Sequence, residues 1–356
     1  MSKRKDLTPA MVKALHEGLV IPAHPLALNE SRQLDEKHQR ALTRYYVASG
    51  AGGIAVAVHS TQFEIRDKEY NLLEPVLRLA AEEVDKANIQ RPFLKIAGIC
   101  GPTEQAVAEA ELAASLGYDI GLLSMGGLIG WEESQILDRV RAIADIIPVF
   151  GFYLQPSVGG RIFSFSFWEQ FAEIEGVVAI KMAPFNRYQT IDVARAVCYS
   201  SRRDEIALYT GNDDNIVTDL LTTYRFNVNG EQVEKKIVGG MLGHWAVWTQ
   251  KAVELLEEIK QVRNNKELSA EWLTRNIEVT ETNAAFFDPA NQFHGCIPGI
   301  HEVLRRQGLL LGRWCLNPKE ELSPGQYEEI DRMYNDYPHL NDDEFVKQHL
   351  QEWLSN

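Results

Sequence analysis

Short apolar segments rich in β-branched residues recur along the chain, and a longer stretch with helical periodicity follows most of them. This alternation is typical of parallel strands joined by helical crossovers. Helix signals support it in the segment 103–116, where Thr103 is the expected N-cap and Gly117 the residue that ends the helix. Eight segments are predicted to be strands: 18–27, 53–60, 93–100, 120–124, 147–154, 177–182, 205–210 and 236–241.

Eight strand and helix units with little chain between them favour a closed (β/α)8 TIM barrel over an open doubly wound sheet. No GxGxxG motif opens the first unit, which disfavours a dinucleotide-binding fold. We expect residues 1–245 to form the barrel with an N-terminal extension. Residues 246–356 are expected to form additional C-terminal helices packed on it, because no linker rich in Pro, Gly or Ser separates the two.

Composition narrows the classes of partner. The net charge of −14 would repel the phosphates of nucleic acids and anionic lipids, so we expect neither as a partner and a small molecule as the substrate. The 4 cysteines form no CxxC pair, which favours reduced thiols over a zinc site. The N-terminus lacks the apolar core of a signal peptide and no apolar run is long enough to span a bilayer, so the expected location is cytoplasmic.

The active site of a TIM barrel lies at the carboxyl ends of its strands, so polar residues at those ends are the candidates for chemistry. In the sixth predicted strand, Lys181 interrupts the apolar sequence directly after residues 177–180. Burial lowers the pKa of an ammonium group, and the neutral amine can attack a ketone to form a Schiff base. The structural alternative is a lysine that reaches the rim or pairs with a carboxylate.

Two further strand ends carry three candidate residues. Tyr153, at the end of the fifth predicted strand, is expected beside Lys181, where its hydroxyl would move protons; a buried structural tyrosine is the alternative. Ser60 and Thr61 follow the second strand and are expected to bind a carboxylate, or alternatively to cap a helix.

In this order, the segments resemble the dihydrodipicolinate synthase and N-acetylneuraminate lyase family of class I aldolases, from about residue 18 to residue 318. VVAIK with Lys181 is similar to the segment that carries the family's Schiff-base lysine, and FYLQP with Tyr153 to its tyrosine segment. AVHST matches the place of the glycine-threonine-threonine motif that binds the pyruvate carboxylate. Three later segments complete the set: YTGNDD with Gly211 and Asp213, VGGMLG with Gly239 and Gly240, and RWCLNP at 313–318.

The chain also departs from the family pattern. His59 replaces the first glycine of the second-strand motif, and the fourth strand ends in SMGGLIG, with Ser124, where the synthase carries proton-relaying tyrosines. Arg161 is displaced from the position of the synthase arginine. The segment KMAPFNRYQT is unlike the usual family sequence, so Asn186 and Arg187 are expected to contact the substrate. The alternative is that this segment is a surface loop. These departures argue against a true synthase and fit another 2-oxo acid, such as a sugar acid or an aryl or alkyl pyruvate adduct.

We therefore expect a lyase or aldolase that needs no cofactor, and the resemblance implies a homo-oligomer, dimer or tetramer. A dehydratase of 2-keto-3-deoxy sugar acids that uses the same iminium, a pyridoxal phosphate barrel and a non-catalytic 2-oxo acid sensor remain open. So does a metal enzyme with ligands among His24, His59, Asp213, Asp214 and His244. The expected catalytic residues are Lys181 and Tyr153, and the expected substrate-binding residues are His59, Ser60, Thr61, Ser124, Asn186, Arg187, Asp213 and Gly240.

Overall fold

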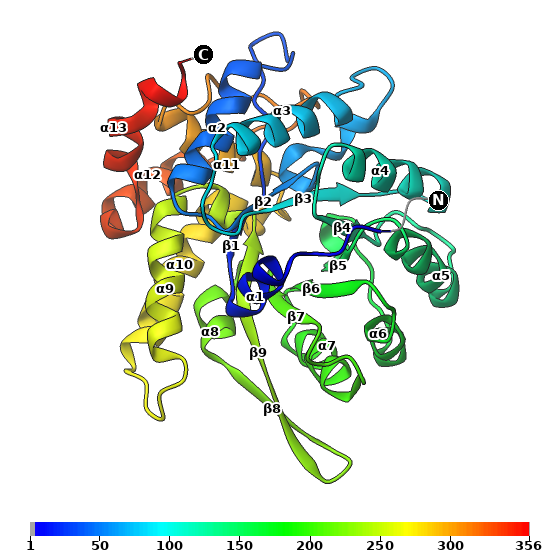
Figure 1. The fold of residues 1–356 in the computed structure, drawn as a ribbon. Coiled ribbons are helices and arrows are strands. Elements are labelled where there is room, and N and C mark those ends of the chain that lie inside the picture. Colours follow the sequence, from blue (N-terminus) through cyan, green and yellow to red (C-terminus); the bar gives the residue numbers. More distant parts are fainter. Residues whose placement is uncertain (1–3, 356) are drawn as a thin grey trace.

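The computed structural model describes residues 4–355, and a barrel of parallel strands forms its centre (Figure 1). The strands are hydrogen-bonded in the order β1-β9-β7-β6-β5-β4-β3-β2. A parallel bridge between Ala23 and Ala55 joins the two ends of this sheet and closes the barrel. The predicted TIM barrel is confirmed. Its strands are β1 (Val20–Pro22), β2 (Gly53–Val56), β3 (Leu94–Ile99), β4 (Ile120–Ser124), β5 (Val149–Leu154), β6 (Val177–Ala183), β7 (Ala207–Thr210) and β9 (Glu231–Leu242).

Helices surround the barrel, and the last five lie together on one side of it (Figure 1). The helix predicted for 103–116 is α4, whose N-cap is Pro102 and not Thr103, because Pro102 already has extended dihedral angles and Thr103 begins the helix. Gly117 ends this helix at φ 78°, as predicted. The helices are α1 (Pro9–Glu17), α2 (Glu36–Ala48), α3 (Leu73–Lys86), α4 (Thr103–Ser115), α5 (Glu133–Ala144), α6 (Phe165–Ala172), α7 (Arg187–Tyr199), α8 (Ile216–Leu221), α9 (Thr249–Val262), α10 (Glu271–Phe287), α11 (Cys296–Arg306), α12 (Gln326–Asp336) and α13 (Asp343–Trp353).

One element was not predicted. Strand β8 (Thr223–Val228) pairs antiparallel with the first half of β9, and the resulting ribbon extends away from the barrel (Figure 1). Its turn is formed by Asn229 and Gly230, both at positive φ, which is the preferred chemistry of a tight hairpin. The Asn-Gly pair is a sequence signal for a hairpin turn, but it lies in a connection that was expected to be a helical crossover.

Two apolar layers form the core. One fills the barrel with side chains such as Ile96, Leu122 and Phe150, and the other lies between the strands and the surrounding helices. Helix α1 closes the amino end of the barrel, since Leu15 belongs to the inner layer and the Leu15 carbonyl accepts a hydrogen bond from the Tyr209 hydroxyl at 2.8 Å. The carboxyl ends of the strands therefore remain as the place for a site.

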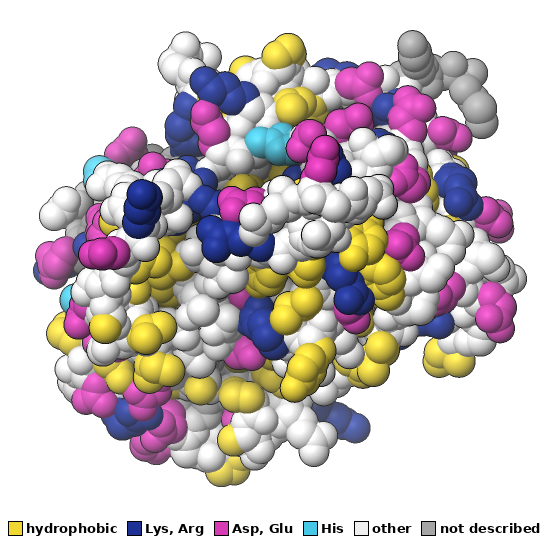
Figure 2. Space-filling model, turned by 90° about the horizontal axis from the view of Figure 1, so that it is seen from below, with side chains coloured by type: hydrophobic (Ala, Val, Ile, Leu, Met, Phe, Trp, Pro, Cys, Tyr) yellow, Lys and Arg dark blue, Asp and Glu magenta, His cyan; other side chains and the backbone are white. Residues whose placement is uncertain are grey.

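The outer surface is mixed in character. Acidic, basic and apolar side chains are interspersed on the face seen in Figure 2. Ion pairs such as Arg225 with Glu234, at 2.6 Å on the ribbon, compensate charge locally. Within residues 4–355, every helix is too short or too polar to cross a membrane.

A buried carboxylate ties the C-terminal helices to the barrel. Asp342, just before α13, accepts hydrogen bonds from the Tyr45 hydroxyl of α2 at 2.7 Å and from the Gln250 backbone N–H of α9 at 3.0 Å. The Gln307 amide, which follows α11, donates a third bond at 2.8 Å. Four segments distant in sequence thus share one acceptor.

We expect Asp342→Ala to lower the free energy of unfolding by about 2–4 kcal/mol, because it leaves buried donors without an acceptor. Chemical denaturation monitored by circular dichroism measures this change. Asp138→Ala is the control, since the Asp138 carboxylate is 76% exposed and pairs only with Arg141, and the expected change is within about 0.5 kcal/mol. Equal stability of the two variants would contradict the prediction.

Candidate active site

A cavity opens at the carboxyl ends of the barrel strands. Its floor and walls come from the strand ends, and its roof comes from the C-terminal helices and the loop between them. The polar residues of the lining are few, whereas apolar and aromatic side chains are numerous. The lining consists of Ala23, Val58, His59, Ser60, Phe152, Leu154, Gln155, Val158, Lys181, Ala183, Phe185, Gly211, Asp213, Gly243, Phe287, Phe293, Cys296 and Ile300.

Lys181 lies on β6 with its amine in this cavity, at the position expected from the sequence. Its Nζ lies 4.3 Å from the centre of the Phe152 ring. Burial lowers the pKa of Lys181, and the negative charge of Asp213 opposes that shift. Gly211 makes room for the lysine, because a Cβ atom at Gly211 would lie 2.5 Å from Lys181 Cε.

Asp213 follows β7 and faces the same cavity. Its Oδ1 accepts a hydrogen bond from the His244 backbone N–H at 3.1 Å, which fixes the carboxylate. Burial raises the pKa of Asp213, while the positive charge of Lys181 and this hydrogen bond act in the opposite direction. Lys181 therefore holds its proton less tightly than a lysine in water, and Asp213 holds its proton more tightly than an aspartic acid in water.

The second strand is followed by the short 3₁₀ helix η1 (His59–Thr61), which contributes His59 and Ser60 to the cavity. Burial, and next the charge of Lys181, lower the pKa of His59 to about 4, so its imidazole is neutral at pH 7. The Ser60 hydroxyl donates to the Ala23 carbonyl at 2.9 Å. Thr61 does not line the cavity, because its hydroxyl is turned to the His24 carbonyl at 2.6 Å.

Tyr153 does not lie beside the Lys181 amine, contrary to expectation. Side chains alternate between the two faces of a strand, so the inward position of Phe152 on β5 turns Tyr153 outward into the layer between barrel and helices. There the Tyr153 ring packs on Trp168 at 4.9 Å and its hydroxyl accepts a long bond from the Phe163 N–H at 3.5 Å. This position is that of a structural tyrosine.

Four other expected contacts also lie outside the cavity. Asn186 caps α7 by accepting from the Tyr188 and Gln189 N–H groups, and Arg187 pairs with Asp219 at 2.6 Å. Ser124 accepts from the Gly126 N–H at 3.4 Å at the end of β4. Gly240 faces Trp245, since a Cβ atom there would lie 2.6 Å from Trp245 Cζ3. These four residues thus make structural contacts outside the cavity.

The cavity also contains residues that the sequence did not suggest. Phe152 was accessible to prediction, because it shares the inward face of β5 with Phe150. The roof residues Phe287, Phe293 and Cys296 were not, since they come from the C-terminal region, far from Lys181 in sequence. Phe293, at φ 66°, contacts Phe185, at φ 49°, with 5.8 Å between ring centres. Two non-glycine residues in the left-handed region thus help to close the cavity.

The histidines considered as metal ligands do not converge. The His24 ring contacts the Thr43 hydroxyl and the Pro25 carbonyl, each at 2.9 Å. The His244 ring packs on Phe286, with 5.8 Å between ring centres. Across the described part of the chain, no group of three or more His, Cys, Asp or Glu side chains is arranged to hold a metal ion.

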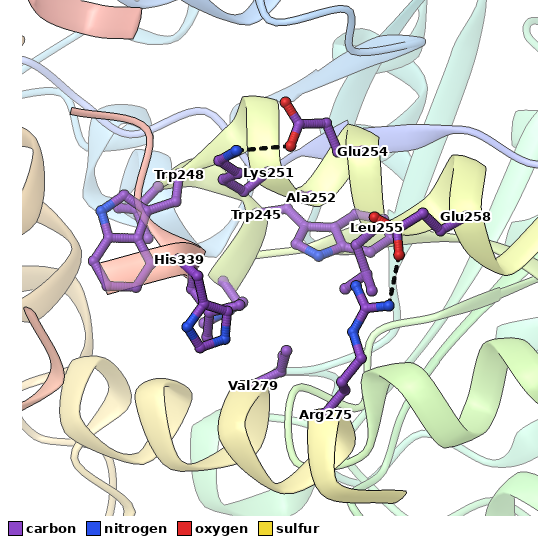
Figure 3. Close-up of a pocket in the computed structure, with 13 residues that line it drawn as sticks. Trp245, Trp248, Lys251, Ala252, Glu254, Leu255, Glu258, Arg275, Val279 and His339 are labelled. Carbon is purple, nitrogen blue, oxygen red and sulfur yellow. Dashed lines mark hydrogen bonds and ion pairs between the residues drawn. The ribbon is translucent and has the colours of Figure 1, made fainter. Parts of the chain in front are cut away.

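A second cavity is lined mainly by residues of α9 and α10 and of the short segment before α9 (Figure 3). Trp245, Trp248 and Val279 form much of its apolar wall, and its charged residues pair with one another, as Arg275 does with Glu258 at 2.6 Å. His244 lines this cavity while its backbone holds Asp213 in the first one. His244 therefore connects the lining of this cavity with the carboxylate of Asp213.

One curated relative was found by sequence comparison. The chain is 31% identical over 135 residues to 4-hydroxy-tetrahydrodipicolinate synthase of Clostridium novyi (strain NT). This match covers 38% of the chain and 44% of the relative, so it spans less than half the length of either. No protein-family model matches the chain.

Solved structures are similar over almost the whole chain. Dihydrodipicolinate synthase from Bacillus clausii has a TM-score of 0.73 at 18% identity, covering 92% of this chain and 99% of that one. N-acetylneuraminate lyase from Fusobacterium nucleatum has a TM-score of 0.67 at 17% identity, covering 91% and 99%. At these identities the structures establish the fold, and the local sequence match is to a synthase. The predicted resemblance to the dihydrodipicolinate synthase and N-acetylneuraminate lyase family is therefore confirmed in the fold and in this one stretch of sequence.

Proposed function

We propose that the protein is a class I lyase or aldolase that acts on a 2-oxo acid through a Schiff base on Lys181. The observation that carries this proposal is the buried amine near the carboxyl end of β6, which shares a largely apolar cavity with the Asp213 carboxylate. The curated relative, a 4-hydroxy-tetrahydrodipicolinate synthase, supports the same class of chemistry.

The proposed step begins with the neutral Lys181 amine. It attacks the C2 carbonyl, and the carbinolamine loses water to give an iminium. Asp213 is suited to exchange protons with the nitrogen, because its pKa is raised toward neutrality by burial and its carboxylate is fixed by the His244 N–H. Phe152 beside Nζ favours a cationic iminium through the electrons of its ring.

The lining also favours one class of substrate tail. Apart from Lys181, the residues that line the cavity include no Lys or Arg. The roof is aromatic and aliphatic, with Phe185, Phe287, Phe293 and Ile300. A polyhydroxylated sugar chain would leave many hydroxyl groups without partners there, whereas an aryl or alkyl tail would bury favourably. We therefore favour an adduct of a 2-oxo acid with an apolar aldehyde.

Cleavage of C3–C4 and loss of a C4 hydroxyl as water both start from this iminium, so an aldolase and a dehydratase share the first half of the reaction. In cleavage the iminium nitrogen accepts the electron pair of the C3–C4 bond. In dehydration it accepts the electron pair of the C3–H bond, and the resulting enamine then expels the C4 hydroxyl, which leaves with a proton as water. The cytoplasmic location and the homo-oligomer expected from the sequence stay predictions.

Borohydride treatment in the presence of pyruvate is expected to add one reduced pyruvate adduct to the wild-type protein, at Lys181. Lys181→Ala should abolish the adduct, because the only cavity amine is lost, and Lys251→Ala, in the second cavity, should retain it. Intact-protein and peptide mass spectrometry give the readout. An adduct on another lysine, or none with any 2-oxo acid tested, would rule out the proposal.

The rate of imine formation should rise with pH as Lys181 loses its proton, with a midpoint below the ordinary lysine value of 10.5, because burial lowers the pKa of Lys181. Asp213→Asn removes the negative charge that raises this pKa, so the midpoint should move to lower pH. Stopped-flow measurement of pyruvate binding across pH tests both statements. A midpoint that stays unchanged in Asp213→Asn would refute the proposed pairing.

A further inference from the structure

His59 is partly exposed and differs in its surroundings from the buried histidines His24, His38, His244 and His301. The His24 and His244 rings contact neighbouring protein groups, and the His301 ring is sealed in the core. His59 lines the Lys181 cavity. Burial and the charge of Lys181 account for its lowered pKa, and no hydrogen bond to a residue in the range 4–355 contributes. A neutral imidazole, with one N–H donor and one acceptor nitrogen, is therefore available to a bound molecule.

Other polar groups of the cavity are less suited to accept a proton from carbon. The Ser60 hydroxyl already donates to Ala23, and Gln155 does not titrate. Burial raises the pKa of the Cys296 thiol well above its usual value, so it stays protonated. Tyr153 lies in the outer layer, away from the cavity. His59 and Asp213 remain, and the proposed function already assigns Asp213, fixed by the His244 N–H, to proton exchange with the Lys181 nitrogen.

The barrel places His59 across the cavity from Lys181. In the closed order of strands, β2 and β6 are separated by three strands on either side. Both residues line the same cavity, so a 2-oxo acid bound to the Lys181 nitrogen through C2 would share that cavity with the His59 imidazole. Asp213 follows β7, which neighbours β6, so the two groups that could move protons come from different sides of the barrel.

We propose that His59 is a catalytic residue that removes and returns the proton at C3 of the Lys181 iminium. The imidazole nitrogen takes the C3 proton, the C–H electron pair becomes the C2–C3 double bond, and the electron pair of the C2–N double bond becomes the lone pair of an enamine nitrogen. The imidazolium then returns the proton to carbon, which restores the iminium. This inference rests on the proposed function and assigns its proton carrier.

Hydrogen exchange at the methyl group of pyruvate tests this step without knowledge of the natural substrate. Proton NMR in D₂O follows the exchange, and borohydride trapping of the same sample follows the Schiff base. In His59→Asn, we expect exchange to slow about 100-fold or more while the trapped adduct forms at the wild-type level. Tyr153→Phe is the matched control and should exchange within about threefold of wild type, because the Tyr153 hydroxyl lies outside the cavity.

The outcomes separate the inference from the proposed function. If His59→Asn forms the adduct normally and exchanges the methyl hydrogens at the wild-type rate, the role of His59 is overturned and the Schiff base stands. The same holds if exchange slows only in Tyr153→Phe. Loss of both exchange and adduct in His59→Asn and in His59→Gln, with an unchanged circular dichroism spectrum, overturns it as well, because His59 would then act before the iminium. No adduct in the wild-type protein would remove the proposed function and this inference together.

Discussion

The cost of burying the Lys181 amine inside a barrel of apolar side chains governs the rest of the site. That cost is offset in part by the Asp213 carboxylate, by the Phe152 ring at 4.3 Å and by the space that Gly211 leaves for the lysine stem. An ammonium with these few partners is poised to lose its proton, which is the condition for nucleophilic attack on a carbonyl group.

Asp213 in turn depends on the C-terminal part of the chain. The N–H group that fixes its carboxylate belongs to His244, which directly follows β9, and the roof over the cavity comes from α10, α11 and the loop between them. Asp342 anchors α13 to α2, α9 and the end of α11 by shared hydrogen bonds. The C-terminal helices therefore complete the active cavity rather than merely cover the barrel.

The alternation of side chains along a strand decides in part which titratable groups face the cavity. On β5 the inward position is Phe152, so the tyrosine of the family-like segment FYLQP is directed away from the lysine. At the end of β2, His59 stands where the family motif has a glycine and brings an imidazole into the cavity. The cavity thus contains the His59 imidazole but not the Tyr153 hydroxyl, and its roof is apolar.

The sequence alone determined the barrel, its eight strands and the positions of Lys181 and Asp213, because strand periodicity and polar residues at strand ends are local properties. The alternation that turns Phe152 inward on β5 also turns Tyr153 outward, so this direction was accessible from the sequence. That Arg187 pairs with Asp219 was not accessible, because the two residues lie on different helices. Only the tertiary structure brought Phe287, Phe293 and Cys296 over Lys181, because contacts between distant segments depend on how helices pack, which local pattern does not encode.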